Sequence, residues 1–355
     1  MPSLIAVSRK KNLVDLPNGR TSHNGAIPNL GGVALFASLI ITVLTFTNLR
    51  SFPSVQYITP GLVILFFIGL KDDVMAISAH TKLRGQIVAT AIVVILGNIR
   101  FTNLHGFLGI GSIGYLPSVI LSIFVIIVII NCFNLIDGID GLCGGMGVLI
   151  SLTFGAWFFI NNNNEYVLVA STIIGALLAF LYYNVLSKKN KIFLGDTGAM
   201  ILGYMVAILA IQFNEFTIGA TGIAAVSSAP AVSIAFIFMP LYDVLRVFVL
   251  RIISGKSPFS ADRLHMHHLL IGMGLSHIKA TGILLSFQVL FILIGLTFQH
   301  LPIWALTLLL LVLGITISSS MKYISKKQIN QNSYAPANNL SMTIMINKKA
   351  DKTNK

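Results

Sequence analysis

The stretch LVILFFIGLKDDV (residues 62–74) places an apolar run directly before one lysine and two adjacent aspartates, Asp72 and Asp73. A helix that spans a bilayer needs about 20 predominantly apolar residues, and this run continues one that starts near residue 54. Two neighbouring carboxylates repel each other, and here they stand where a bilayer would meet water. The stretch predicts a membrane helix that ends in a pair of acids. The alternative is that the two acids have no function and are simply solvated at the end of the helix.

The composition extends this prediction to most of the chain. Of the 355 residues, 55% are hydrophobic and 10% are charged, whereas about 25% are charged in an average soluble domain. The long apolar runs also lack the alternation of a β-barrel strand. We therefore predict an all-α polytopic integral membrane protein with about ten transmembrane helices, near residues 30–48, 54–70, 85–99, 115–133, 146–160, 166–186, 198–213, 218–245, 281–298 and 303–319.

The positive charges indicate the orientation. Nearly all lysines and arginines fall in loops on one side of the predicted spans, and only Arg50 and Arg100 fall on the other side. By the positive-inside rule the basic side faces the cytoplasm, which predicts a multi-pass protein of the plasma (inner) membrane. Basic loops beside an anionic lipid leaflet explain the net charge of +13, so no nucleic-acid partner is needed.

Most of the acids and histidines lie on this same predicted cytoplasmic side. In NCFNLIDGIDGL (131–142), Asn134, Asp137 and Asp140 are spaced three residues apart, so they share a face of a helical turn. Polar groups massed directly after an apolar run need partners and are functional by default in membrane proteins. Two further motifs, taken alone, do not indicate a function. FLGDTG (193–198) is also typical of a helix N-cap, and HMHH (265–268) is also typical of a surface loop or an incomplete soft-metal site.

The donor types favour a hard cation. Carboxylates and asparagine amides without a thiolate cluster are typical of sites for Mg²⁺, with Mn²⁺ as the alternative, rather than zinc. We expect Cys132 and Cys143 to be reduced and structural, because they show no CxxC spacing. A site in which Lys, Arg and His side chains surround Mg²⁺ can bind a diphosphate and stabilise a leaving phosphate.

Five motifs occur in a recognisable order along the chain. They are DLPNGRTSHNGAIPNLGG (15–32), KDDV (71–74), NCFNLIDGIDGL (131–142), FLGDTGAM (193–200) and RIISGKSPFSADRLHMHH (251–268). Together they resemble the polyprenyl-phosphate N-acetylhexosamine-1-phosphate transferases of glycosyltransferase family 4, in the branch of WecA and TagO rather than that of MraY. The resemblance covers roughly residues 4 to 320.

The resemblance implies a transfer reaction between two substrates. An N-acetylhexosamine-1-phosphate, most often GlcNAc-1-phosphate, would move from a UDP-sugar to undecaprenyl phosphate, releasing UMP and starting a cell-surface polysaccharide such as O-antigen or teichoic acid. GalNAc, FucNAc and QuiNAc donors remain alternatives. The lipid phosphate is already mostly dianionic at neutral pH because its second pKa is about 6, so we expect direct attack, with a covalent aspartyl intermediate as the alternative.

The resemblance also assigns roles to residues of this chain. It implies Asp196 as the metal ligand, with Asn134 beside it. It implies four catalytic acids, namely Asp72, Asp73, Asp137 and Asp140. The implied substrate-binding residues are Asn131, Asn134, Lys82, Arg246, Arg263, His265, His267 and His268.

The chain departs from the family at its start. MPSLIAVSRKKN resembles the tail of a helix that members of this branch carry before the first motif. We expect that the start codon is recorded too late and the helix is missing for that reason; the alternative is a protein that dispenses with this span. The restored helix would make about eleven spans. We predict one transmembrane catalytic domain over residues 1–320, a polar disordered tail over 321–355, contact with membrane lipid, and a sequence compatible with a homodimer.

A membrane transporter is the alternative from another class. Transporters hold carboxylates near the bilayer midplane, often on broken helices in two repeated halves. In this chain the acids stand at the ends of the predicted helices and the two halves show no repeat. The pattern therefore favours an enzyme that acts at the membrane surface.

Overall fold

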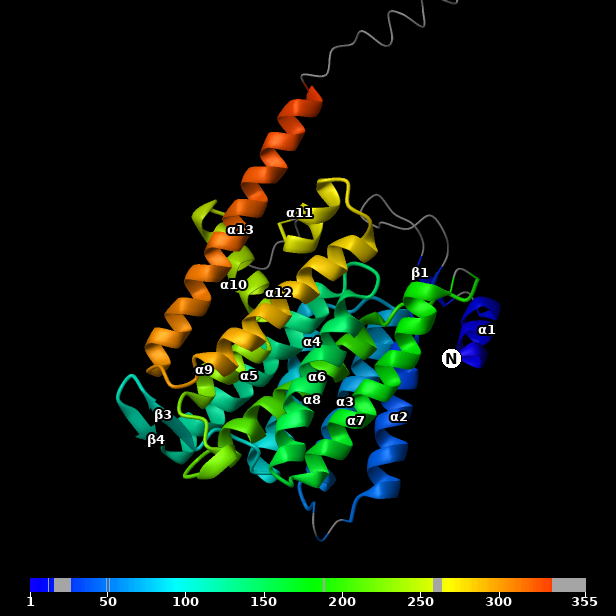
Figure 1. The fold of residues 1–355 in the computed structure, drawn as a ribbon. Helices are drawn as coiled ribbons and strands as arrows, with labels where there is room; N and C mark the ends of the chain where they lie inside the picture. Colours follow the sequence, from blue (N-terminus) through cyan, green and yellow to red (C-terminus); the bar gives the residue numbers. More distant parts are fainter. Residues whose placement is uncertain are drawn as a thin grey trace, which may run out of the picture.

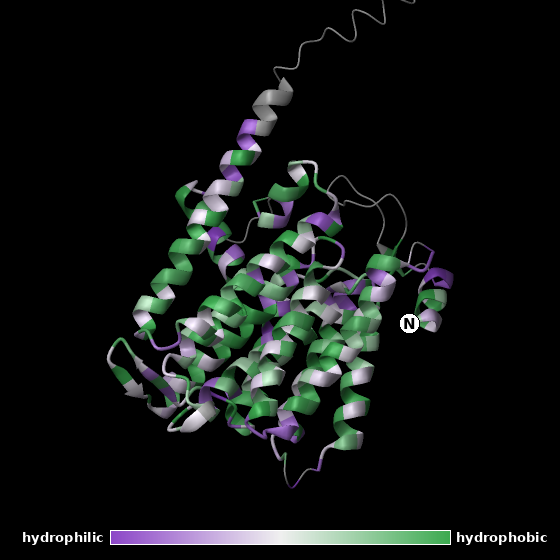
Figure 2. Ribbon diagram, viewed as in Figure 1, coloured by the Kyte–Doolittle hydropathy of each residue, from purple (hydrophilic) through white to green (hydrophobic). Residues whose placement is uncertain are grey.

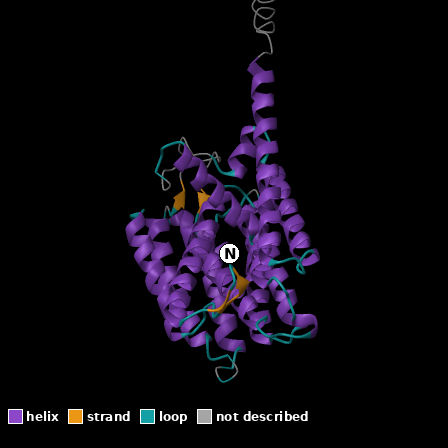
Figure 3. Cartoon of the chain, turned by 90° about the vertical axis from the view of Figure 1, so that its left-hand side faces the viewer, coloured by secondary structure: helices purple, strands orange, loops and turns teal. Residues whose placement is uncertain are grey.

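The computed structural model describes the chain except for residues 12, 16–26, 49, 51, 188, 258–263 and 334–355. Helices make up most of it, and two short strand pairs lie toward opposite ends of the helical body (Figures 1 and 3). The elements are α1 (Pro2–Lys10), β1 (Val14–Asp15), β2 (Ile27–Pro28), α2 (Gly31–Phe46), α3 (Val55–Val74), α4 (Ala79–Ala91), η1 (Ile92–Leu96), β3 (Asn103–Phe107), β4 (Ile110–Ser112), α5 (Tyr115–Ile136), α6 (Leu142–Ile160), α7 (Asn164–Leu181), η2 (Tyr182–Leu186), α8 (Gly195–Phe216), η3 (Gly222–Ala224), α9 (Ala229–Phe236), α10 (Phe238–Ile253), α11 (Met266–Gly272), α12 (His277–Thr297) and α13 (Ile303–Ser333).

The helices confirm the prediction of an all-α, multi-pass membrane protein. Among the described residues, 8 helices are long and apolar enough to cross a membrane, or up to 9 if a bent pair counts as one span. Most residues along these helices are hydrophobic (Figure 2). The first predicted span is α2, whose 16 residues make about 24 Å of helix and stop short of a bilayer core of about 30 Å.

The prediction of one span over 218–245 is wrong in its geometry. The structure has α9 and α10 there, bent by 84° at Ile237. Pro240 stands in the first turn of α10, where a proline is tolerated because its missing N–H has no intrahelical partner. A proline there cannot continue a helix from α9, so the chain turns before it.

Gln288 of α12 satisfies the backbone groups that this break leaves unpaired. Its amide nitrogen donates to the carbonyl oxygens of Ala235 at 3.0 Å and Phe236 at 2.9 Å, and its Oε1 accepts the N–H of Met239 at 3.0 Å. The side chain is fully buried. Inside a membrane such groups find no water, so the bend depends on this one side chain.

α8 forms the centre of the body. In its most apolar window 83% of the residues are buried, against at most 44% in the other seven long apolar helices that are described. Two glycine contacts allow this packing. A Cβ atom on Gly32 of α2 would lie 2.2 Å from the backbone nitrogen of Gly198, and one on Gly203 would lie 2.6 Å from the Cα of Ile130 in α5. The backbones of α2 and α5 therefore lie in direct contact with the backbone of α8 at these two glycines.

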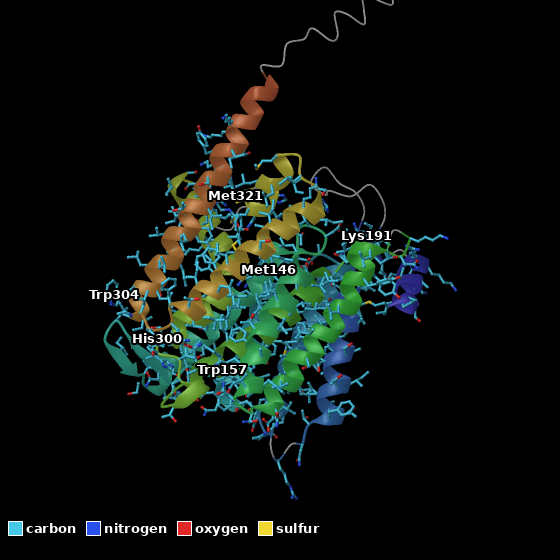
Figure 4. All side chains as sticks on the ribbon, viewed as in Figure 1. Met146, Trp157, Lys191, His300, Trp304 and Met321 are labelled. Atoms are coloured by element: carbon cyan, nitrogen blue, oxygen red, sulfur yellow. The ribbon has the colours of Figure 1, made fainter. Side chains whose placement is uncertain are left out.

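The two ends of the body differ. α11 and β1 lie at one end, and the β3–β4 hairpin lies at the other (Figure 1). Lys191 and Met321 are on the α11 side, whereas His300 and Trp304 are on the hairpin side (Figure 4). α13 projects past the α11 end and remains helical to Ser333, so no break marks the domain boundary that the sequence predicts at residue 320. The rest of the predicted tail lies outside the described residues.

We predict that Gln288→Met destabilises the folded protein. Methionine matches the length of glutamine but removes three hydrogen bonds, to the Ala235 and Phe236 carbonyls and from the Met239 N–H, and each lost hydrogen bond to a buried group costs about 1–3 kcal/mol. Thermal unfolding in detergent should show a clearly lower midpoint. Ser286→Ala is the control, because this exposed hydroxyl bonds only to Gly282 of its own helix. Equal midpoints for the two variants would contradict the bridging role of Gln288.

Candidate active site

The topology brings the polar motifs to one end of the helices. Counted along the chain, α3 and α5 end where α4 and α8 begin, because neighbouring spans run in opposite directions. The KDDV motif closes α3, Lys82 stands in the first turn of α4, the asparagines of NCFN close α5, and Asp196 opens α8. Residues far apart in the sequence therefore meet at a single place.

Asp73 holds the N-terminus of α8. Its Oδ1 accepts the N–H of Asp196 at 2.7 Å, and its Oδ2 accepts the N–H of Thr197 at 3.1 Å and the Thr197 hydroxyl at 2.6 Å. The first N–H groups of a helix lack intrahelical partners, so a carboxylate from another helix caps them as a local cap would. Both oxygens of Asp73 are thus engaged, and the residue positions Asp196.

The end of the first motif is tied to the same turn. The N–H groups of Gly31 and Gly32 donate to the carbonyls of Phe193 and Leu194 at 2.9 and 2.8 Å, and the N–H of Phe193 donates to Pro28 at 2.7 Å. The Asn29 amide donates to the Asp73 carbonyl at 3.0 Å. Segments 27–32 and 193–197 are therefore joined by backbone hydrogen bonds beside the end of α3.

Asp72 belongs to a different cluster from its neighbour. Its Oδ2 lies 2.9 Å from the Nζ of Lys82, and its Oδ1 accepts the N–H of Ile77 at 2.9 Å. Lys82 Nζ also lies 2.9 Å from Asp196 Oδ1 and 3.4 Å from Asn134 Oδ1. The Asn134 amide nitrogen donates to the same Asp196 oxygen. We call Asp72, Lys82, Asn134 and Asp196 the lysine cluster.

Asn131 lies one helical turn before Asn134 and has its own partners. Its amide donates to Gln86 Oε1 at 3.0 Å and to the Ile127 carbonyl at 2.8 Å. Gln86 is buried, and it follows Lys82 by one turn of α4. The Gln86–Asn131 pair thus joins α4 to α5 next to the lysine cluster, and substrate binding by the half-buried Asn131 stays a prediction.

Asp140 forms an ion-pair network outside the lysine cluster. Its Oδ2 lies 2.6 Å from Lys191 Nζ and 3.0 Å from His277 Nδ1. Burial opposes ionisation of Asp140, but the hydrogen bonds from His277 and Lys191 outweigh it and hold the pKa of this carboxyl below its ordinary value. The network ties the loop after α5 to the start of α12 and to the loop before α8.

Asp137 is the acid that lacks a counter-charge. Within the part of the chain that the structure describes, no hydrogen bond or ion pair reaches its carboxylate. Burial raises the pKa of Asp137 to about 7, and the negative charges of Asp196, Asp73 and Asp140 act in the same direction. The site therefore holds a carboxyl that gains or loses its proton near neutral pH.

The histidine motif is arranged around Asp243 of α10. Asp243 Oδ2 lies 3.0 Å from His265 Nδ1, and its Oδ1 accepts the N–H of Met266 at 2.9 Å. Arg246 donates to the Leu264 carbonyl at 2.9 Å. Both side chains that were expected to bind substrate, Arg246 and His265, are thus engaged in holding segment 264–268 against α10.

His267 connects this segment to the second acidic motif. Its Nε2 lies so close to Gly138 that a Cβ atom there would be 2.4 Å away. Burial lowers the pKa of His267 to about 3, and the neighbouring His268 acts in the same direction, so the ring is neutral. Its ring centroid lies 4.2 Å from that of His268. The last of the predicted substrate-binding residues, Arg263, lies outside the described residues.

The donor set of the lysine cluster fits a hard divalent cation. Among the described residues no group of three or more His, Cys, Asp and Glu side chains could hold a metal ion. Mg²⁺ needs less, since it is commonly bound by one or two carboxylates together with waters and substrate phosphates. Oxygens of Asp72, Asp196 and Asn134 all lie around a single position, which the Nζ atom of Lys82 occupies.

Several residues of the site were not singled out by the sequence. Thr197, Gln86, Asp243, Lys191, His277 and Asn184 all bond directly to a predicted residue or its loop. The i,i+4 spacing of Lys82 and Gln86 is a usable signal, because it places both on one face of a helix. For His277 and Asn184 the sequence carries no such signal, since their partners lie far away in the chain.

Comparisons with known proteins agree with these motifs. A family model, Glycosyl transferase family 4, matches residues 55–214. Undecaprenyl-phosphate alpha-N-acetylglucosaminyl 1-phosphate transferase of Haemophilus influenzae is 32% identical over 279 residues, which are 76% of this chain and 74% of that protein. The chain belongs to glycosyl transferase family 4.

Two further relatives also match most of the chain. The enzyme of the same name from Escherichia coli O157:H7 is 29% identical over 316 residues, or 86% of this chain and 83% of that protein. Decaprenyl-phosphate N-acetylglucosaminephosphotransferase of Mycobacterium tuberculosis is 28% identical over 288 residues, or 74% of this chain and 70% of that protein. The family match at 55–214 includes the lysine cluster but not the histidine motif.

We predict that substitutions of the two adjacent aspartates, Asp72 and Asp73, differ in their effect on stability. Asp73→Asn replaces one accepting oxygen by an NH₂ group that faces the donors of α8, which costs about 1–3 kcal/mol. Asp72→Asn keeps this cap and should lower the unfolding midpoint in detergent much less. The assignment of Asp73 to α8 would be wrong if both variants unfolded at the same temperature.

Asp137 should make stability depend on pH in a defined direction. Its folded pKa of about 7 lies above the unfolded value of about 3.9. Between these values the folded chain holds a proton that the unfolded chain has released, so the contribution of Asp137 to stability falls as pH rises. The stability gained by Asp137→Asn should grow from pH 5 to pH 7 and then level off. Unfolding midpoints of the variant and the wild type at pH 5, 6, 7 and 8 measure this, and a gain that shrank with pH would contradict it.

Proposed function

We propose that this chain transfers N-acetylglucosamine-1-phosphate from UDP-GlcNAc to undecaprenyl phosphate. The products would be UMP and a lipid-linked sugar diphosphate, the first intermediate of a cell-surface polysaccharide. Support comes from the names of its relatives, which describe transfer of an N-acetylglucosamine phosphate to a polyprenyl phosphate. Support also comes from the matched region, since it contains each residue of the lysine cluster.

The observation that carries the proposal is the place of the lysine cluster. Two carboxylates, one amide and one ammonium meet where α3 and α5 end and α4 and α8 begin. A prenyl chain can stay in hydrocarbon while its phosphate reaches the ends of the helices, and a sugar nucleotide can arrive from water. A site at the helix ends suits a reaction between one lipid and one soluble substrate.

The proposed chemistry is a single displacement. An oxygen of the lipid phosphate attacks the β-phosphorus of the UDP-sugar, a new P–O bond forms, and the bond from that phosphorus to the bridging oxygen breaks. The electron pair leaves with UMP. Because the attacking phosphate is mostly dianionic, alignment and charge neutralisation matter more than removal of a proton.

The residues of the lysine cluster divide this work. Lys82 supplies a positive charge to the phosphates, and Asp72 orients Lys82 and the attacking group. Asp196 and Asn134 would hold Mg²⁺, which when bound supplies charge neutralisation to the diphosphate. Asp73 acts through Asp196 by fixing the first turn of α8. Asp137 and Asp140 line the neighbouring loop, where a carboxyl with a pKa of about 7, that of Asp137, can accept a residual proton from the lipid phosphate.

The proposal places the site on the cytoplasmic side of the plasma membrane. The loops at this end of the helices hold most of the lysines and arginines, as the positive-inside rule requires for the cytoplasmic face. Sugar nucleotides are also found in the cytoplasm. The transporter alternative receives no support from the site, since the acids stand at helix ends rather than at mid-membrane depth.

A direct assay tests this function. Purified protein receives undecaprenyl phosphate, Mg²⁺ and labelled UDP-GlcNAc, and both UMP and lipid-linked GlcNAc diphosphate are measured. We expect both products in equal amounts and none after EDTA. Should neither form, UDP-GalNAc and the UDP-linked 6-deoxy amino sugars are tested next, and failure with the whole panel would reject the reaction.

Asp196→Asn tests the site within this assay. We expect turnover to fall by about 100-fold or more, because a ligand and a charge are lost at the reacting phosphates. Glu215→Gln, at the other end of the same helix, is the matched control and should remain within about threefold of the wild type, since Glu215 bonds to Thr102 far from the cluster. A fully active Asp196→Asn enzyme would contradict the metal assignment.

A further inference from the structure

We propose that Lys82 is a resident cation that occupies the position of the metal ion and must leave it before a divalent cation binds. The inference rests on the proposed function, because it concerns the same site. It assigns to Lys82 two positions, one on the carboxylates of Asp72 and Asp196 and one on the phosphates of the substrate. The first offsets one of the two negative charges at rest, and the second makes Lys82 available for the reaction.

The distances around Lys82 are those of a central cation. Its Nζ lies 2.9 Å from Asp72 Oδ2, 2.9 Å from Asp196 Oδ1 and 3.4 Å from Asn134 Oδ1. These oxygens come from α3, α8 and α5, and they converge on a single atom. An ammonium has three N–H donors and no acceptor, so three oxygen partners satisfy it fully.

The orientation of Asn134 is set by this arrangement. Its Oδ1 faces the ammonium, and its Nδ2 donates to Asp196 Oδ1. The opposite orientation would point an NH₂ group at an ammonium and an oxygen at a carboxylate. Asn134 therefore already presents to the central point the oxygen that a metal ion would need.

Lys82 and a divalent cation cannot share these oxygens. Two positive charges a few ångströms apart, partly shielded from water, repel each other by several kcal/mol at the effective dielectric of a protein surface. The side chain of Lys82 is 15% exposed, so it has a route outward. Asp196, at 35% exposure, is the more open of its two acidic partners, which makes it the partner that Lys82 gives up.

The exchange couples the metal to the anionic substrate. In the resting chain a metal ion must compete with Lys82 and binds weakly. A diphosphate offers Lys82 a new partner and offers the metal additional oxygens, so each ligand favours the other. The site would then bind metal and sugar nucleotide together and would bind neither well alone.

Metal binding to the substrate-free protein tests the competition. Mn²⁺ is titrated into detergent-purified protein, and free Mn²⁺ is measured by its electron paramagnetic resonance signal. Lys82→Gln removes the competing charge and should bind Mn²⁺ at least about tenfold more tightly than the wild type. Lys191→Gln changes the net charge equally but lies in the Asp140 network, so it should change the affinity by less than about threefold. Equal or weaker binding by Lys82→Gln would overturn the proposal.

A second measurement uses the wild type and does not depend on the folding of a variant. Reductive methylation of lysine amines is followed by mass spectrometry with and without Mg²⁺. Lys82 should react several times faster with Mg²⁺ present, because it is then released from the carboxylates, whereas Lys279 should react at an unchanged rate. An unchanged or slower reaction of Lys82 would reject its displacement.

Neither measurement uses a sugar nucleotide or a lipid acceptor. A protein that fails in the transfer assay with every donor can therefore still show the exchange at Lys82. Conversely, an active enzyme whose Lys82 does not respond to metal would retain the proposed function and lose this inference.

Discussion

Three hydrogen bonds from the start of α8 to Asp73 determine where the site lies. α8 is the most buried of the long helices that are described, and its first turn carries Asp196 and Thr197. The charge of Asp73 compensates the positive end of this helix and satisfies N–H groups that a membrane protein cannot leave unpaired. α3 and α8 are thereby locked in register, and Asp72, one residue earlier, is carried to Lys82.

The same requirement explains the other irregular parts of the backbone. The break at Ile237 is tolerated because Gln288 accepts one N–H and donates to two carbonyls. The loop after α5 is tolerated because the N–H of Gly141 donates to Asn184 Oδ1 at 2.7 Å, while the Asn184 amide donates to Ile192 at 2.9 Å. In each case a single amide side chain from a neighbouring segment replaces the water that a soluble protein would use.

The sequence predicts the helices well because their signal is local. Long apolar runs mark α3, α5 and α12 within a few residues, and alternation of the basic loops predicts that the motifs share one end. It fails at 218–245, where composition continues across Ile237 but the proline at 240 divides the run. Hydrophobicity has no direction, so it cannot show a bend of 84°. The predicted domain boundary at residue 320 falls within α13, which is helical to Ser333, and it stays a prediction.

The sequence predicts which residues belong to the site but not which contact each of them makes. The motifs give the acids and asparagines of the lysine cluster, yet nothing in DD tells that Asp73 faces a helix N-terminus while Asp72 faces a lysine. That difference comes from helical geometry, because adjacent residues on a helix point about 100° apart. Partners such as His277 for Asp140 depend on a contact across more than a hundred residues, which no local pattern encodes.

The charge balance of the site limits how the proposed substrates can bind. Asp72, Asp196 and Asp137 bring up to three negative charges to a region where Lys82 is the cation held between two of them. A diphosphate and a lipid phosphate would add more negative charge in a place partly shielded from water, where repulsion is strong. Anions can then bind only if cations arrive with them or if protons are retained. In the proposed exchange a divalent ion would meet the first condition and release Lys82 toward the phosphates, and Asp137, with its pKa of about 7, meets the second. With Asp137 protonated, Lys82 offsets one of the two negative charges of Asp72 and Asp196, and a bound divalent ion would offset part of the charge that the phosphates add.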